Sequence, residues 1–230
     1  MARPHQTFEV YLEIGKKRAI AGAIEWPGWC RSGRDEAGAL QALVDAAPRY
    51  ARALDAAGIA FQAPTDAAAL AVVERLQGDS GTDFGVPAIA PAGDKHPIDA
   101  AELRRQQALL RACWQALDVA IRAAEGHELR LGPRGGGRDL EKIARHVLEA
   151  EAGYLSRLAW KAEKRDGGDL RGELGQVHQA TLDALAAAVQ DGLPERGPRG
   201  GAIWLPRYFV RRVAWHVLDH VWEIEDRVLE

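Results

Sequence analysis

The sequence predicts an α+β fold, in which a small α+β domain with a β-hairpin and a helix precedes a C-terminal four-helix bundle. Three features predict it: period-two hydrophobicity near the N-terminus, a segment rich in Gly, Pro and Asp at residues 78–97, and four segments with helical spacing after it. Because residues 78–97 mark a change in composition, we expect one domain at residues 1–97 and the other at residues 98–230.

The N-terminal domain is expected to begin with a hairpin. TFEVYLEI at residues 7–14 alternates apolar and polar side chains, GKK turns the chain, and RAIAGAIEW is the partner strand, which ends at PGW. RDEAGALQALVDAA and RYARALDAAG have helical spacing, and Pro48 between them predicts a kink or a restart. LAVVERLQG is a candidate strand that could pair with the hairpin, and residues 78–97 are expected to form a loop.

The C-terminal domain contains four amphipathic segments. They cover residues 99–126, about 138–164, 172–192 and 206–230, and Asp139 is the expected N-cap of the second. Four such helices joined by loops predict a four-helix bundle, a fold in which metal sites are built from side chains on facing helices.

Composition restricts the function classes. The formal net charge of −3 argues against a nucleic-acid partner, and no apolar run approaches the roughly 20 residues that span a bilayer. The N-terminal residues show no apolar signal-peptide region, and Cys30 and Cys113 lie far apart outside any CxxC motif. We therefore expect a cytoplasmic protein that acts on a small molecule, without a nucleic-acid or membrane partner, and the sequence leaves a homodimer open.

The stretch WHVLDHVWEIED at residues 215–226 raises the question of a metal site. His216 and His220 are four residues apart and lie on one side of a helix, where they can supply two ligands. The candidate for a third is His146 in IARHVLEAEAGYL, which lies on a helix face with Ile143, Ala150 and Gly153. It shares a level with the pair if the second and fourth helices run the same way. The alternative is a set of core histidines with satisfied N–H groups, which is the expectation for His178 on the third helix.

The ARHVLEAE of the second helix and the RRVAWHVLDHVWEIEDR of the fourth resemble the DinB superfamily of metal-binding four-helix bundles, over about residues 100–230. The resemblance implies that His146, His216 and His220 bind a divalent metal. Zinc, nickel and iron all suit imidazole, and the sequence does not distinguish them. Three histidines leave a coordination position for water or substrate, as in catalytic sites.

The leading functional hypothesis is a divalent-metal-dependent enzyme of DinB-like type. Several DinB-like proteins use mycothiol, bacillithiol or glutathione, so the resemblance implies a thiol-dependent S-transferase or a hydrolase acting on a small molecule, with a low-molecular-weight thiol as co-substrate. The alternative is a non-enzymatic module, stabilised by the metal, that recruits a protein partner through the N-terminal domain. No protein nucleophile is expected, because Cys113 lies in the middle of a helix beside Trp114 and reads as a core residue.

Two further pairs of residues are candidates near the metal. Glu149 and Glu223 follow a ligand by three residues and could orient the imidazole rings, unless they belong to solvated helix faces. GPRGG occurs at residues 132–136 and 197–201, and alternating helix directions would place both copies at one end of the bundle. There Arg134 and Arg199 could bind an anionic substrate group, unless the repeats are ordinary flexible loops.

The N-terminal domain resembles the HicB-like antitoxin fold, over about residues 6–76. The resemblance rests on the hairpin and on IEWPGWCRSGRDEAGALQAL, in which Trp29 separates Gly28 from Cys30 and EAGAL stretches the usual Glu-Ala-Leu run. It implies no catalytic residue. An adaptor, a dimerisation surface or a lid over the metal end is the expected role.

Overall fold

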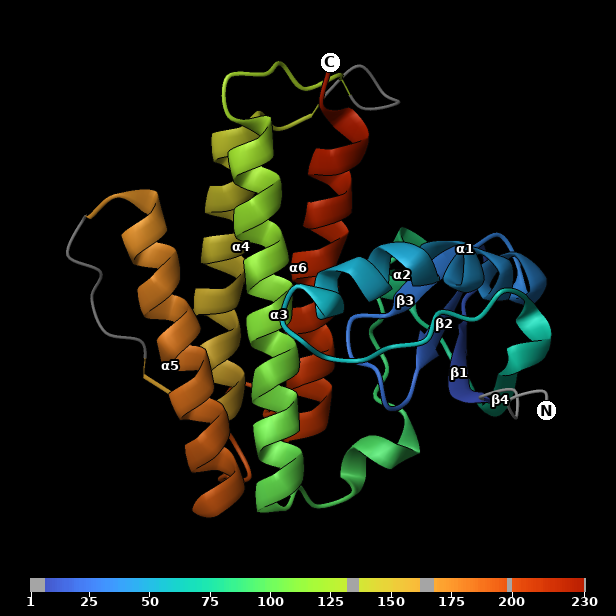
Figure 1. The fold of residues 1–230 in the computed structure, drawn as a ribbon. Coiled ribbons are helices and arrows are strands. Elements are labelled where there is room, and N and C mark those ends of the chain that lie inside the picture. Colours follow the sequence, from blue (N-terminus) through green and yellow to red (C-terminus); the bar gives the residue numbers. More distant parts are fainter. Residues whose placement is uncertain (1–6, 132–136, 162–167, 198–199, 230) are drawn as a thin grey trace. The chain divides into compact units, whose positions relative to one another are not determined.

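A computed structural model describes residues 7–131, 137–161, 168–197 and 200–229. The chain divides into two compact units, Met1–His96 and Pro97–Glu230 (Figure 1). The fold class is α+β, as predicted: the first unit holds a four-stranded mixed sheet with a helix, and the second holds four long helices that pack together.

The sheet of the first unit has the strand order β3-β2-β1-β4. Its strands are β1 (Phe8–Ile14), β2 (Ala19–Ala23), β3 (Cys30–Gly33) and β4 (Leu70–Gln77). The predicted hairpin is the antiparallel pair β1–β2, and the candidate strand LAVVERLQG is β4, which pairs with β1 in parallel. A parallel pair needs a crossover connection, and the chain between β3 and β4 supplies it.

The strand β3 was not expected, because the sequence analysis ended the strands at PGW. Its four residues, CRSG, have no period-two apolar pattern, so pairing with β2 rather than hydrophobicity defines the strand. Gly33 at its end lies against the helix that follows, where an added Cβ would clash with the backbone nitrogen of Ala39. The close approach of strand and helix therefore requires glycine at this position.

Helix α1 (Glu36–Asp55) continues through Pro48, so the predicted restart at this proline was wrong. The carboxylate of Asp35 caps its N-terminus by accepting a hydrogen bond from the backbone N–H of Gly38. Burial on both sides of Pro48 holds the helix in one piece, since Leu43 before it and Tyr50 after it are both fully buried. This packing compensates for the backbone hydrogen bond that proline removes.

Residues 78–97 are more ordered than the predicted loop, because they contain α2 (Ser80–Phe84) and the 3-10 turn η2 (Ala92–Lys95). The carboxylate of Glu13 in β1 is fully buried and accepts hydrogen bonds from the hydroxyl of Thr82 and from the backbone N–H groups of Ala88 and Ile89. Burial raises the pKa of Glu13, and these hydrogen bonds oppose the increase. One buried carboxylate thus ties this segment to the sheet.

The second unit is built from α3 (Ala100–Ala124), α4 (Leu140–Leu155), α5 (Leu170–Gln190) and α6 (Pro206–Arg227). Asp139 caps α4 as predicted, by accepting a hydrogen bond from the backbone N–H of Lys142. Helix α4 ends nine residues before the expected Lys164. The chain continues as a 3-10 turn and then leaves the helix axis through a residue in the left-handed conformation, Ala159, with a φ of 57°.

The four helices do not alternate in direction. In Figure 1, α3 and α6 run one way and α4 and α5 run the other way. Backbone hydrogen bonds agree. The N–H of Arg130, six residues after the end of α3, reaches the carbonyl of Arg227 at the end of α6, and the N–H of Trp204, just before α6, reaches the carbonyl of Arg157 just after α4. The expectation of alternating directions was therefore wrong, because α5 runs in the same direction as α4.

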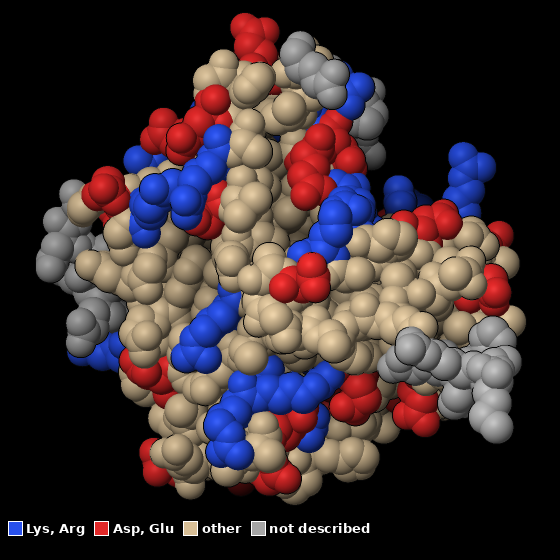
Figure 2. Space-filling model, viewed as in Figure 1, with Lys and Arg blue, Asp and Glu red and all other residues tan. Residues whose placement is uncertain are grey.

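The surface and the helices give two further observations. Acidic and basic side chains are interspersed over α3 and α5 on the face shown in Figure 2, and neither sign dominates there. Among the helices of the described ranges, none combines the length and the hydropathy needed to cross a bilayer.

We predict that a shortened chain comprising Pro97–Glu230 folds by itself. The four helices bury their own apolar stripes, which is the condition for an independent domain. Circular dichroism should show its helical signal and a single cooperative thermal transition. Loss of either would mean that the first unit completes the helical core.

Candidate metal centre

The structure brings together the three histidines selected from the sequence. His146 lies in the second turn of α4, while His216 and His220 lie one turn apart in α6. One nitrogen from each ring lies within 4.8 Å of the others, and Nε2 of His216 is 3.3 Å from Nε2 of His146. They share a level because α4 and α6 are antiparallel, which places the start of α4 beside the end of α6.

The geometry suits a metal ion better than a hydrogen bond. In a tetrahedral zinc site with Zn–N distances of about 2.0–2.1 Å, neighbouring ligand nitrogens lie about 3.3 Å apart. The Nε2 atoms of His146 and His216 have this separation. In addition, Nδ1 of His216 is buried and has no hydrogen-bond partner among the described residues. No hydrogen bond at Nδ1 therefore fixes the orientation of this ring within the described part of the chain. The donor set therefore fits one ion.

Two of the three imidazoles are held in the neutral form that binds metals. Burial lowers the pKa of His216 to about 3, and the neighbouring imidazoles and Arg212 lower it further. Burial also lowers the pKa of His146, with Arg138 as the next cause. A neutral ring offers one nitrogen lone pair, whereas a protonated ring offers none.

Glu223 orients one of the three rings. Its Oε2 lies 2.8 Å from Nδ1 of His220, and its Oε1 accepts a hydrogen bond from Nη1 of Arg227 at 2.5 Å. The bond to His220 is the main reason why the pKa of Glu223 is lowered. With Nδ1 engaged as a donor, Nε2 of His220 carries the free lone pair. Glu149, the other candidate carboxylate, is exposed, and no hydrogen bond links it to His146 within the described part of the chain.

An aromatic wall beside His216 was not predicted. The ring of Tyr154 lies 5.9 Å from the ring of His216. The guanidinium of Arg212, four residues before His216, lies 5.0–5.9 Å from the ring centroids of Trp215, Trp204 and Tyr154. The spacing of Arg212 from His216 was a usable signal, because residues i and i+4 share a helix side. Trp204 could not be found this way, since it precedes α6.

The two arginines of the GPRGG repeats, Arg134 and Arg199, lie outside the described residues. The flanks of the repeats lie at opposite ends of α4: Gly137 lies beside the side chain of Arg227, and Gly197 lies beside the carbonyl of Ser156. The shared end inferred from alternating helices is therefore absent. The three histidines lie toward the end that carries Gly137.

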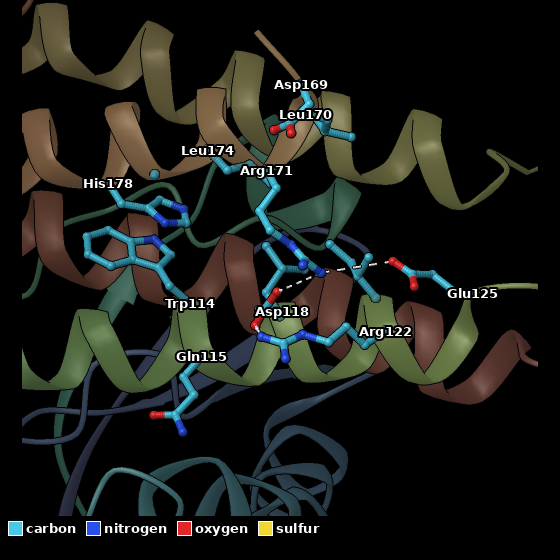
Figure 3. Close-up of a pocket in the computed structure, with 13 residues that line it drawn as sticks. Trp114, Gln115, Asp118, Arg122, Glu125, Asp169, Leu170, Arg171, Leu174 and His178 are labelled. Atoms are coloured by element: carbon cyan, nitrogen blue, oxygen red, sulfur yellow. Dashed lines mark hydrogen bonds and ion pairs between the residues drawn. The ribbon is translucent and has the colours of Figure 1, made fainter.

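A second polar cluster lies inside the bundle. The carboxyl of Glu151 in α4 is fully buried and accepts a hydrogen bond from Nε1 of Trp114 in α3, at 3.1 Å to Oε2. The ring of His178, from α5, stacks on Trp114 with centroids 4.2 Å apart (Figure 3). Its Nε2 lies 3.7 Å from Oε2 of Glu151. Helical spacing could have revealed Glu151, because it continues the apolar stripe formed by Val147 and Leu148.

Burial makes both members of this cluster neutral near pH 7. It raises the pKa of Glu151 to about 8 and lowers the pKa of His178 to about 4. The pair is therefore a neutral acid beside a neutral imidazole rather than a salt bridge. Cys113 is also buried, and its pKa is raised to about 12, so its thiol is not a nucleophile.

No family model, curated protein or solved structure matches this chain. The resemblances to the DinB superfamily and to the HicB-like fold therefore rest on the motifs in the sequence. For the DinB superfamily, the structure adds a helical C-terminal unit with a three-histidine cluster, which is consistent with the resemblance.

We predict that Glu151→Gln raises stability and that the gain grows with pH. The protonated carboxyl stabilises the fold fully below pH 4.5, and this contribution is lost as pH rises toward the folded pKa of about 8. A neutral glutamine removes that loss, which is on the order of 3 kcal/mol at pH 7. Urea unfolding of both proteins at pH 5, 6, 7 and 8 measures the difference.

Comparison with the wild type removes the effect of His178. Its pKa is lowered to about 4, so both proteins lose stability as pH falls below 6.5. A difference between Glu151→Gln and wild type that stays constant from pH 5 to pH 8 would show that Glu151 is ionised in the folded protein.

Proposed function

We propose that His146, His216 and His220 bind one divalent metal ion and that the chain is a metal-dependent enzyme of DinB-like type acting on a small molecule. The observation that carries the proposal is the convergence of three imidazoles from two helices. Among the described residues, no cysteine, aspartate or glutamate joins them as a fourth ligand. An ion with three protein ligands keeps a position for water or substrate.

A bound divalent ion would supply Lewis acidity, by which it lowers the pKa of a coordinated water or thiol. The chain's own residues prepare the site. Glu223 holds His220 in one tautomer, and burial keeps His216 neutral. The guanidinium of Arg212 lies beside the rings of Tyr154 and Trp204 and close enough to His216 to lower its pKa. Its positive charge would favour an anionic substrate group.

The thiol-dependent transferase is the reaction class that we favour. A thiolate must come from a co-substrate, because the thiol of Cys113 is buried with a strongly raised pKa and Cys30 is also buried. A low-molecular-weight thiol meets this requirement, and the resemblance to the DinB superfamily points to the same class. Hydrolysis is the other reaction that an open metal position supports.

We predict that the purified protein holds about one divalent ion per chain and that the histidine variants lose it. His216→Ala should abolish stoichiometric binding, because it removes a buried ligand that no other described residue can replace. His146→Ala should weaken affinity by tenfold or more, the order of effect of altering a metal site. Elemental analysis and competition with a chromogenic chelator measure both effects.

His178→Ala is the matched control, since His178 is also a half-buried histidine on a bundle helix but contacts Trp114 instead. It should keep the full metal content. If His146→Ala retained wild-type affinity, the proposed three-ligand site would be wrong.

We predict that the metal-loaded protein transfers a small thiol to an electrophilic acceptor. Mycothiol, bacillithiol and glutathione would be screened with 1-chloro-2,4-dinitrobenzene, and ester hydrolysis would be followed in parallel. Turnover should require the metal and disappear in His216→Ala. Stoichiometric metal without turnover or thiol binding would favour the non-enzymatic, metal-stabilised module.

A further inference from the structure

The α3–α4 connection, residues 125–139, passes the C-terminal end of α6 (Figure 1). Backbone hydrogen bonds hold its described residues there. The N–H of Arg130 donates to the carbonyl of Arg227 at 2.7 Å, and the N–H of Leu229 donates to the carbonyl of Glu128 at 3.0 Å. The three histidines lie toward this same end of the bundle, so the connection and the candidate metal centre are neighbours.

The side chain of Arg227 binds three acceptors in different parts of this region. Its Nε donates to the carbonyl of Arg130 and its Nη2 to the carbonyl of Arg138, both at 2.8 Å, while its Nη1 donates to Oε1 of Glu223 at 2.5 Å. The side chain is only 12% exposed. A guanidinium is planar with its donors in a fixed geometry, so three partners determine its place and its orientation.

Glu223 lies between this guanidinium and the histidine group. Its Oε1 accepts the bond from Arg227, and its Oε2 lies 2.8 Å from Nδ1 of His220. The carboxylate is 28% exposed, so without Arg227 one oxygen would be left to water and the group could turn away from the ring. A continuous series of hydrogen bonds therefore runs from two carbonyls of the α3–α4 connection, through Arg227 and Glu223, to His220.

Gly137 shows how closely the connection approaches the guanidinium. Its φ is 152°, and an added Cβ would clash with Nη2 of Arg227. Glycine is the residue that combines this backbone conformation with so close an approach. The contact is additional to the three hydrogen bonds, and it makes the place of the guanidinium sensitive to the backbone of the connection.

We propose that Arg227 is a positioning residue of the metal centre: it holds Glu223 against His220 and ties that carboxylate to the α3–α4 connection, so that metal affinity depends on how the connection is held. The inference rests on the proposed function, because it takes the three histidines as metal ligands. A carboxylate that accepts the second N–H of a ligand histidine fixes the ring, and changing such a partner lowers metal affinity about 10–100-fold. Arg227 acts one step behind that partner, through Glu223.

The zinc affinity of the full-length protein, measured by competition with a chromogenic chelator, tests this role. Arg227→Ala should weaken zinc binding by about tenfold or more, because the carboxylate of Glu223 then loses the bond that holds it. Arg122→Ala is the matched control, since it also removes an arginine paired with a carboxylate one turn earlier on a bundle helix. It should bind zinc as the wild type does. Wild-type affinity in Arg227→Ala would overturn the proposal.

A double-variant cycle tests the route through Glu223. Glu223→Ala should weaken zinc binding by about tenfold or more. Adding Arg227→Ala to it should cause almost no further loss, because residues in one hydrogen-bond network do not act additively. Losses that add in full would mean that Arg227 acts on the metal by another route, and the positioning role would be wrong.

Two glycine variants test the dependence on the connection. Gly137→Ala should displace the guanidinium of Arg227 and lower zinc affinity toward that of Arg227→Ala. Gly126→Ala is its control, because Gly126 lies in the same connection and also has a positive φ, 82°, but an added Cβ there meets no atom within 4 Å. It should keep the wild-type affinity. Equal zinc affinity in the two glycine variants would refute the link to the connection.

Nitrogen-15 NMR of the metal-free protein separates this inference from the proposed function. His220 should carry its proton on Nδ1, facing Glu223, and Arg227→Ala should raise the share of the Nε2–H tautomer. A purely structural role would leave the tautomer unchanged, and that result would overturn the positioning role. If the wild type bound no zinc while the tautomer shifted, the proposed function would fall and the hydrogen-bond series would stand. Zinc binding that Arg227→Ala leaves intact would refute this inference alone.

Discussion

The burial of α6 on nearly every side is the constraint on which the helical unit depends. All residues from Tyr208 to Leu218 are buried, and these include Arg211, Arg212 and His216. A helix in this position cannot expose its polar groups to solvent, so each of them costs stability unless it is paired within the protein or binds a ligand. Three aromatic rings surround the guanidinium of Arg212, and His146 faces His216 from the antiparallel helix α4. The candidate metal centre is thus a consequence of where α6 lies.

Helix α4 carries polar groups toward two different environments. His146 faces α6, whereas Glu151, five residues later, faces α3 and α5. Five residues correspond to a rotation of about 140° from one side of the helix toward the other. A buried polar group lowers the stability of the fold unless it is hydrogen-bonded or binds a ligand. Helix α4 buries such groups in two places, at the three-histidine group and beside the stacked rings of Trp114 and His178. Buried polar groups of this kind are typical of functional sites.

The same principle operates in the first unit with a different result. Glu13 is as fully buried as Glu151, but a hydroxyl and two backbone N–H groups donate hydrogen bonds to it. Its carboxylate organises residues 78–97 against the sheet. Glu151 accepts only the indole N–H of Trp114 among the described residues, and its pKa rises further as a result. The donors around Glu13 fix its carboxylate in place, whereas Glu151 keeps acceptor capacity that no described residue uses.

The sequence by itself determined the α+β class, the positions of the main helices and the one-turn spacing of His216 and His220, because hydrophobic periodicity and helical spacing are local properties. It also selected His146, although on the premise that the second and fourth helices are parallel. The tertiary structure alone decided the antiparallel packing of α4 and α6, the strand β3 and the continuity of α1 through Pro48. These features depend on contacts between residues far apart in the chain. For the same reason, the Glu151–Trp114–His178 cluster appears only when three helices meet.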